Sequence, residues 1–316
     1  MRKITFISIL LIAALSSLFL TSCSSSDESS SKDSSKSSDG KASAFSASLK
    51  AVQDAKSYKF SATVSISGSV GGQETNGDIT MEGKNSADGK TSLVIINLGS
   101  VFGDLGGLGA GTDLEVEQRI IDGVAYTKNL DILGLGSETW TKKDLSALLE
   151  SQEAQNPNQY LQYLNAAGAD VEKVGSEEIN GVETTHYKSV LTKEMLQKQF
   201  ESEEWKQYYT EQGLSEEDFE KFKRAYLEGL SNTPVDLWVD EDDLPVRMKI
   251  STEINASGLT GAADSDGDSR VSSIFTIDFS DWGTDLDIQA PPEDQILTQE
   301  EYEAQIRDQL LSQLGA

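Results

Sequence analysis

The sequence predicts an α+β fold in which helices cover one apolar face of a mostly antiparallel β-sheet. Three observations lead to this prediction. Apolar and polar residues alternate over several segments, as they do in strands with one buried face. Most connections between these segments are too short for the crossovers that parallel strands need. Other segments carry apolar residues at helical spacing and can cover the apolar face of the sheet.

The first expected elements are a helix and a strand. Phe45, Leu49 and Val52 recur at helical spacing, which predicts a short helix ending near residue 56. The next segment alternates polar residues with Tyr58, Phe60, Ala62, Val64 and Ile66, as a half-buried strand does. Further strands are expected over residues 77–84, 90–98, 182–191, 234–240, 245–254 and 271–279, and a hairpin over residues 114–128 turns at Asp122-Gly123.

Further helices are expected over residues 142–151, 159–167, 192–209, 215–230 and 298–314. Ser215 is placed as an N-cap, with acidic residues in the first turn after it. Thr298 and Glu301 have the spacing of a capping box. The last segment then carries an apolar stripe at residues 302, 306, 310 and 314.

The N-terminus has the order of a secretion signal: a basic head, an apolar run, and then Leu20-Thr21-Ser22-Cys23. Small residues before a cysteine at this point resemble the bacterial lipobox. The resemblance implies a diacylglyceryl thioether on Cys23 and removal of residues 1–22. It also allows N-acylation of the new N-terminal amino group of Cys23. Two alternatives are an uncleaved transmembrane helix and an ordinary signal peptide with a chance cysteine. Lipidation predicts a protein anchored to the cell membrane on its extracytoplasmic face.

Charge and composition exclude several classes of function. The chain has 316 residues, with 26 basic and 53 acidic residues and a formal net charge of -27. Loss of Arg2 and Lys3 with the signal would leave 24 basic residues and a net charge of -29. Because the chain is this acidic, it repels phosphate backbones and anionic headgroups. Nucleic-acid binding is therefore not expected. Cys23 is the only cysteine and His186 the only histidine, so neither a disulfide nor a multi-histidine zinc site is expected, and no cofactor is predicted.

The chain divides into a signal peptide, a flexible tether, a folded domain and a C-terminal helix. Residues 1–22 are the lipoprotein signal peptide, and residues 23–43 form a serine-rich flexible tether. The folded domain covers residues 44–296, with a helical insertion at residues 192–230. Residues 297–316 form a C-terminal amphipathic helix.

Several short sequence segments, taken together in their order along the chain, resemble the sequence pattern of one family. They are Val174 to Tyr187, Trp140 with Lys143 to Leu145, Pro234 to Asp240 with Leu244 to Met248, and Phe279 to Gly283 with Ile288 to Pro292. The ordered set is similar to the LppX/LprAFG-like bacterial lipoproteins, which in turn resemble the LolA and LolB carriers. The resemblance covers residues 45–295. It implies a curved half-barrel with helices packed on its concave face, and a hydrophobic cavity that takes acyl chains of lipids or glycolipids.

The chain departs from the family pattern in several places. Residues 241–243 (Glu-Asp-Asp) replace the usual glycine turn, and Arg247 stands alone where the family has a basic pair. The insertion at residues 192–230 is long and acidic, and the C-terminal helix lies beyond the usual end of the family. The positions that line the cavity form no motif.

The candidate cavity wall combines strand and helix residues: Phe60, Ala62, Val64, Ile66, Phe219, Phe222 and Tyr226. An ordinary helix–sheet core is the alternative for the aromatic residues, although in a carrier the core and the cavity wall are the same face. A glycine-rich segment with Val101, Phe102, Leu105 and Leu108 is the candidate mobile apolar rim. The alternative for this segment is a loop packed over the core.

Two further patterns have a functional and a structural interpretation. His186 could serve as a catalytic base, but it falls inside a predicted strand and no Gly-x-Ser-x-Gly motif accompanies it. A structural histidine is therefore expected. Asp264, Asp266 and Asp268 resemble the start of a calcium loop, but Gly267 is displaced and Phe275 stands where the closing glutamate belongs. A polar hairpin tip is the expected role of this segment.

These observations predict a non-enzymatic, membrane-anchored lipoprotein that binds lipid or another amphiphile between sheet and helices. Its partners are the membrane and a hydrophobic lipid or glycolipid, and any protein partner is unknown. A surface interaction or structural lipoprotein with a filled core is the alternative, and an esterase is a distant third.

Overall fold

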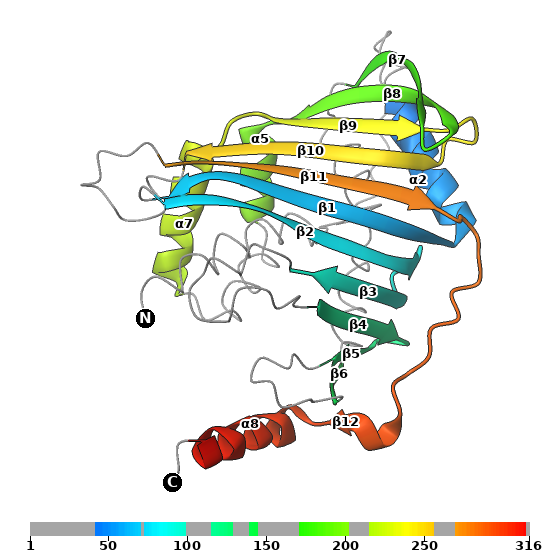
Figure 1. Cartoon of the computed structure of the whole chain (residues 1–316). Coiled ribbons are helices and arrows are strands. Elements are labelled where there is room, and N and C mark those ends of the chain that lie inside the picture. Colours follow the sequence, from blue (N-terminus) through cyan, green and yellow to red (C-terminus); the bar gives the residue numbers. More distant parts are fainter. Residues whose placement is uncertain are drawn as a thin grey trace, which may run out of the picture.

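The computed structural model describes residues 42–70, 73–98, 115–128, 139–144, 171–201, 215–255 and 269–313. Figure 1 shows one large curved sheet with α2, α5 and α7 on its concave side. The twelve strands of this sheet run in the order β12-β6-β5-β4-β3-β2-β1-β11-β10-β9-β8-β7, which leaves the barrel open between β12 and β7. The structure therefore confirms the predicted α+β half-barrel with helices on the concave face.

The strands are β1 (Ser57–Val70), β2 (Gln73–Ser86), β3 (Thr91–Asn97), β4 (Glu115–Ile121), β5 (Val124–Lys128), β6 (Trp140–Asp144), β7 (Glu172–Ile179), β8 (Val182–Leu191), β9 (Thr233–Val239), β10 (Pro245–Asn255), β11 (Arg270–Ser280) and β12 (Ile296–Leu297). The helices are α2 (Ala42–Ala55), α5 (Lys193–Phe200), α7 (Glu216–Gly229), the 3-10 turn η3 (Glu293–Gln295) and α8 (Gln299–Gln313). The first two residues of α2 overlap the end of the predicted tether.

The topology joins two runs of consecutive strands at the centre of the sheet. β1 to β6 extend to one side and β11 to β7 to the other, and β1 pairs with β11 over residues 59–69. Every pair of neighbours is antiparallel except β12 and β6. The short connections of the sequence therefore predicted the pairing mode correctly.

Two tight hairpins use left-handed backbone at both turn residues. Asp122 and Gly123 have φ of 49° and 83°, and Asn180 and Gly181 have φ of 52° and 83°. This conformation matches the twist of the flanking strands, and it favours Asn or Asp followed by Gly. The predicted turn at Asp122-Gly123 is confirmed.

The helices begin where side chains can cap them. Ser215 Oγ accepts a hydrogen bond from the Asp218 amide at the start of α7, and Leu230 is the C-cap. Before α8, Glu301 accepts a hydrogen bond from the Thr298 amide (2.8 Å), while Thr298 Oγ1 accepts one from the Glu301 amide (3.2 Å). Both predicted caps are present.

One predicted helix is wrong at its start. Lys142, Lys143 and Asp144 belong to β6 and pair with Tyr126, Ala125 and Val124 of β5. The helical spacing of the leucines that follow suggested a helix, but backbone pairing with the edge of the sheet decides the conformation of these three residues. Residues 145–170 lie outside the described residues.

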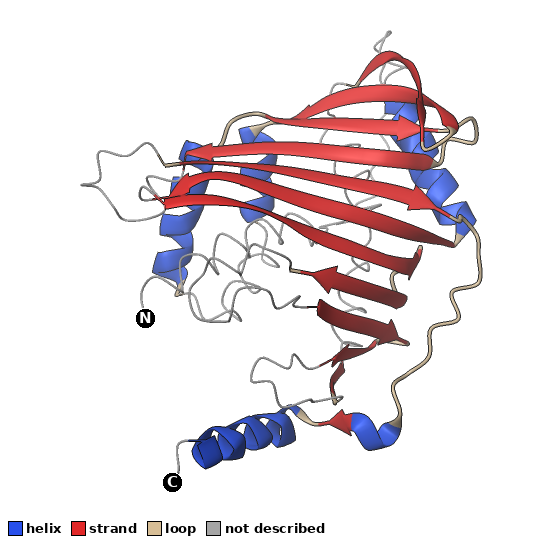
Figure 2. Ribbon diagram, viewed as in Figure 1, coloured by secondary structure: helices blue, strands red, loops and turns tan. Residues whose placement is uncertain are grey.

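A C-terminal strap, residues 281–297, crosses the ends of the strands on its way from β11 to β12 (Figure 2). Ser57 Oγ donates to the Thr284 carbonyl (2.6 Å), Lys84 Nζ donates to the Leu286 carbonyl, and Arg119 Nη1 donates to the Gln289 carbonyl (2.8 Å). β12 then pairs with β6. The strap thus ties β1, β2, β4 and β6 together from outside the concave face.

No helix within the described ranges is long and apolar enough to cross a membrane. The predicted signal peptide and most of the predicted tether, residues 1–41, lie outside the described residues.

Candidate binding face on the concave side of the sheet

The inner face of the sheet is free of charge across eight adjacent strands. The strand register places Phe60, Ala62 and Val64 of β1 on the same face as Ile277 of β11 and Met248 of β10. Followed from β5 through β1 to β9, the positions on this face contain no Asp, Glu, Lys or Arg in these described strands. The charged residues of the same strands fall at the alternate positions, among them Lys59, Glu82, Arg119, Asp236, Arg247 and Asp278.

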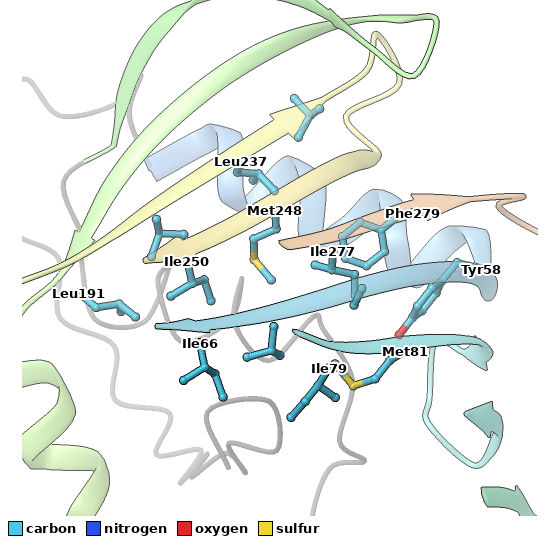
Figure 3. Close-up of a cluster of buried hydrophobic side chains, with 14 of the residues drawn as sticks. Tyr58, Ile66, Ile79, Met81, Leu191, Leu237, Met248, Ile250, Ile277 and Phe279 are labelled. Atoms are coloured by element: carbon cyan, nitrogen blue, oxygen red, sulfur yellow. The ribbon is translucent and has the colours of Figure 1, made fainter. Parts of the chain in front are cut away.

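The inner-face side chains form the main apolar cluster of the protein (Figure 3). Val64, Ile79, Leu237 and Met248 from four strands are nearly inaccessible to solvent. Leu49 of α2 and Met195 of α5 pack against this cluster. The two helices therefore lie on the inner face, and the cluster is the apolar layer between sheet and helices.

The four strand residues of the predicted wall lie together on this face. Ala62, Val64 and Ile66 are buried members of the cluster, and Phe60 is half-buried and packs against it. Period-two alternation was sufficient to identify the buried face of β1, because a strand with one buried face shows its orientation in its sequence.

The three helix residues of the predicted wall belong to a second cluster. Phe219, Phe222 and Tyr226 of α7 pack around Phe200 of α5, with ring centroids 5.4 to 6.4 Å from that of Phe200. Desolvation of the Tyr226 phenol raises its pKa to about 12. The structure thus places the two halves of the predicted wall in separate clusters, because these α7 rings pack on α5, although Tyr226 also packs near Ile254 of β10.

An aromatic group closes the α2 end of the inner face. The ring centroid of Tyr58 lies 5.7 Å from that of Phe279 and 5.1 Å from that of Trp282. Its hydroxyl accepts a hydrogen bond from Asn85 Nδ2 (3.1 Å), and burial raises the pKa of Tyr58.

A few polar side-chain atoms are buried without a hydrogen bond among the described residues. They are Ser189 Oγ, Thr233 Oγ1, Ser48 Oγ and Asn85 Oδ1. The register places Ser189 beside Val235 and Thr233 beside Leu191, so both hydroxyls come from the inner face at the end of the sheet near α5. Sequence reasoning did not identify them, because single Ser and Thr residues in a strand carry no distinctive pattern.

A groove of about 480 Å³ lies between α5 and α7. Its lining includes Lys193, Lys223 and Arg224 together with Glu201, Glu220 and Glu228. Leu227 is the apolar residue of this lining, so the groove is a polar surface beside the second cluster rather than the expected hydrophobic cavity.

His186 lies on the outer face, away from the apolar cluster. Its Nε2 lies 2.6 Å from Asp236 Oδ1, and its Nδ1 lies 3.2 Å from Glu177 Oε1. The ring stacks on Trp238 with centroids 4.4 Å apart, and Trp238 Nε1 donates to Glu177 (2.5 Å). Each ring nitrogen of His186 therefore faces a carboxylate, as expected for a structural histidine that ties β7, β8 and β9 together.

The remaining candidates lie outside the described residues: Cys23, the rim residues Val101, Phe102, Leu105 and Leu108, and Asp264, Asp266 and Asp268. Within the described part of the chain, no three His, Cys, Asp or Glu side chains are grouped to hold a metal ion.

The solved structures similar to this chain include two lipoproteins. LprF from Mycobacterium bovis has 13% identity and a TM-score of 0.41, with 79% of this chain and 96% of that chain covered. LppX from Mycobacterium tuberculosis has 15% identity and a TM-score of 0.40, with 78% and 97% covered.

One similar protein comes from Streptomyces griseus, where it is described as an uncharacterized 31.2 kDa protein in the rplA-rplJ intergenic region. It is 30% identical over an alignment 264 residues long, and the alignment covers 78% of this chain and 76% of that protein. No protein-family model matches. By this identity and coverage, the chain belongs to the family of the Streptomyces griseus 31.2 kDa protein.

Proposed function

We propose that this chain is a membrane-anchored lipoprotein that binds a lipid, a glycolipid or another amphiphile against the concave face of its sheet. The observation that carries the proposal is the absence of charge from that face in the described strands β1 to β5 and β9 to β11. A chain with 53 acidic residues keeps them all off these positions. Such a face suits acyl chains and disfavours ionic ligands.

Burial of acyl chains would supply the binding energy. Each buried CH₂ group contributes about 0.8 kcal/mol relative to water. An acyl chain gains almost the same free energy from burial in the membrane that the lipid leaves. Net movement of lipid therefore needs a donor and an acceptor membrane or protein. The proposed role is therefore that of a carrier or holder tethered through Cys23 to the extracytoplasmic face of the cell membrane.

The proposal is non-enzymatic. The one histidine is stacked on Trp238 and faces Asp236 and Glu177, on the opposite face of the sheet from the apolar layer. A group held in this way has no free nitrogen to serve as a general base for a nucleophile.

A second candidate is a surface interaction or structural lipoprotein with a filled core. The observation that favours it is the tight packing of the inner face, where Tyr58, Ile79, Leu237 and Met248 are almost completely buried. In that case the apolar layer stabilises the fold and takes no ligand.

Native mass spectrometry separates the two candidates. The sample is a soluble form that lacks residues 1–22 and carries serine at position 23. Lipid that co-purifies, or that is taken up when a phospholipid extract is added, supports the binding function. A clean protein mass with no uptake contradicts it.

A pair of variants tests the face itself. Ala62→Leu adds volume to the inner face, whereas Thr63→Leu places the same leucine side chain on the outer face of the same strand. We expect a reduced fraction of lipid-bound protein for the first variant alone, with circular dichroism confirming that both variants fold.

A further inference from the structure

Two hydroxyl groups interrupt the apolar layer near α5. Ser189 and Thr233 are 4% and 3% exposed, and neither hydroxyl has a hydrogen-bond partner among the described residues. In the register of β8 and β9, Ser189 pairs with Val235 and Leu191 pairs with Thr233. The two hydroxyl-bearing residues are therefore diagonal neighbours on one face. Diagonal neighbours on adjacent antiparallel strands lie about 7 Å apart.

The surroundings of the pair are apolar. Leu191 and Val235, the cross-strand partners of the two residues, are both buried members of the main cluster, and Met195 of α5 packs against that cluster. The inner-face positions of β9, β10 and β11 bring no charged side chain to this site.

Two other buried hydroxyls of the described residues have hydrogen-bond partners, whereas Ser48 Oγ of α2 also has none. Thr184 Oγ1, on the outer face of β8, donates to the Glu177 carbonyl at 2.7 Å, and Ser57 Oγ donates to the Thr284 carbonyl at 2.6 Å. Leaving a buried hydroxyl unpaired is unfavourable, so each such group calls for an explanation such as a water or a ligand. Two unpaired hydroxyls at diagonal positions on the proposed binding face point to a ligand contact.

We propose that Ser189 Oγ and Thr233 Oγ1 form a hydrogen-bonding subsite for an uncharged oxygen of the bound amphiphile, such as the carbonyl of an acyl ester. This inference rests on the proposed function. A hydroxyl can donate to an ester carbonyl without bringing charge into the layer. An ionised carboxylate at the same place would lose its hydration with no cation on the neighbouring inner-face positions to compensate. The site therefore selects neutral acyl esters over free fatty acids and over plain hydrocarbons.

Competition binding tests the selection. The soluble form lacking residues 1–22 binds a fluorescent acyl probe, and methyl palmitate, palmitate at pH 8 and hexadecane then displace it. We expect methyl palmitate to bind at least fivefold more tightly than hexadecane, in keeping with the small net contribution of a neutral hydrogen bond. Palmitate should bind more weakly than the ester.

The test variants are Ser189→Ala and the double variant Ser189→Ala/Thr233→Val. The matched control is Ser65→Ala/Thr63→Val, which makes the same changes on the outer face of β1. The double variant should lose the preference for the ester while it keeps hexadecane binding, and the control should keep both. Because neither hydroxyl makes a hydrogen bond within the described residues, removing both should cost no stability. The double variant should therefore unfold at the same urea concentration as the parent protein or at a higher one.

Three outcomes are distinguishable. Loss of ester preference in the double variant supports the subsite. Equal binding of ester and hydrocarbon by the parent protein, or an unchanged preference in the variant, overturns the subsite and leaves the proposed function standing. Failure of every probe to bind overturns the proposed function itself.

Discussion

The ring of Phe60 on β1 lies directly over Gly83 on β2. A Cβ atom at Gly83 would come within 2.8 Å of Phe60 Cε1 and within 2.2 Å of the Leu93 carbonyl oxygen. The absence of a side chain at Gly83 therefore lets an aromatic ring cover the strand at this end of the inner face.

Gly83→Ala should destabilise the protein by about 2 kcal/mol or more, because the ring and the neighbouring strand must both shift to admit a methyl group. The matched control is Gly175→Ala in β7, where an added Cβ meets nothing within 4 Å. Urea unfolding measured by circular dichroism gives both values. Equal stability of the two variants would show that Phe60 does not depend on Gly83.

His186→Ala should destabilise the fold by about 1 to 3 kcal/mol, because the partly buried carboxylate of Asp236 loses its 2.6 Å contact with the ring and Trp238 loses its stacking partner. Lys188→Ala is the control, since Lys188 Nζ lies 3.8 Å from the same carboxylate and is more than half exposed. We expect less than about 0.5 kcal/mol for this control.

Lipid uptake by His186→Ala should match that of the parent protein at temperatures where both are folded. This is because His186 lies on the outer face of the sheet. A selective loss of binding or of any hydrolytic activity in the folded variant would return the histidine to the functional site.

Stability should fall as the pH rises from about 10 to about 12. The pKa of Tyr226 is raised to about 12 in the folded state from its ordinary value of 10.0. Below pH 10 both states hold the proton, whereas between these values the unfolded chain loses the proton that the folded state retains. The free energy of unfolding therefore decreases with pH in this window.

Tyr226→Phe should reduce the alkaline slope in urea unfolding between pH 9 and pH 11.5, and the slope that remains is the contribution of the buried Tyr58, whose pKa is also raised. Phe222→Leu, which changes the same cluster without a titratable group, should lower stability at every pH and leave the slope unchanged. An identical slope in the parent protein and Tyr226→Phe would assign the alkaline loss to other groups.

Cys23→Ala should abolish acylation and leave either an unprocessed precursor or protein released to the medium. Membrane fractionation and intact mass measurement of the full chain check this expectation. Unchanged mass and unchanged partition into the membrane would contradict lipidation. Ser22→Ala, which keeps a small residue before the cysteine, should be processed normally.

Strand alternation and turn pairs were the reliable signals in the sequence. The alternation from Tyr58 to Ile66 identified a strand and its buried face, and Asp122-Gly123 identified a hairpin. The caps at Ser215 and Thr298 were equally local, because a cap depends on side chains within a few residues. The helical pattern beginning at Lys142 misled, since pairing of β6 with β5 depends on residues distant in sequence.

The sequence by itself determined the acidity of the chain, the pairing mode of its strands and the side of each strand that is apolar. Only the tertiary structure decided that β1 meets β11, that α7 packs on both α5 and β10, and that Ser189 and Thr233 are diagonal neighbours in the apolar layer. The physical reason is range: alternation and capping act between residues close along the chain, whereas register and packing bring together residues that no local pattern relates.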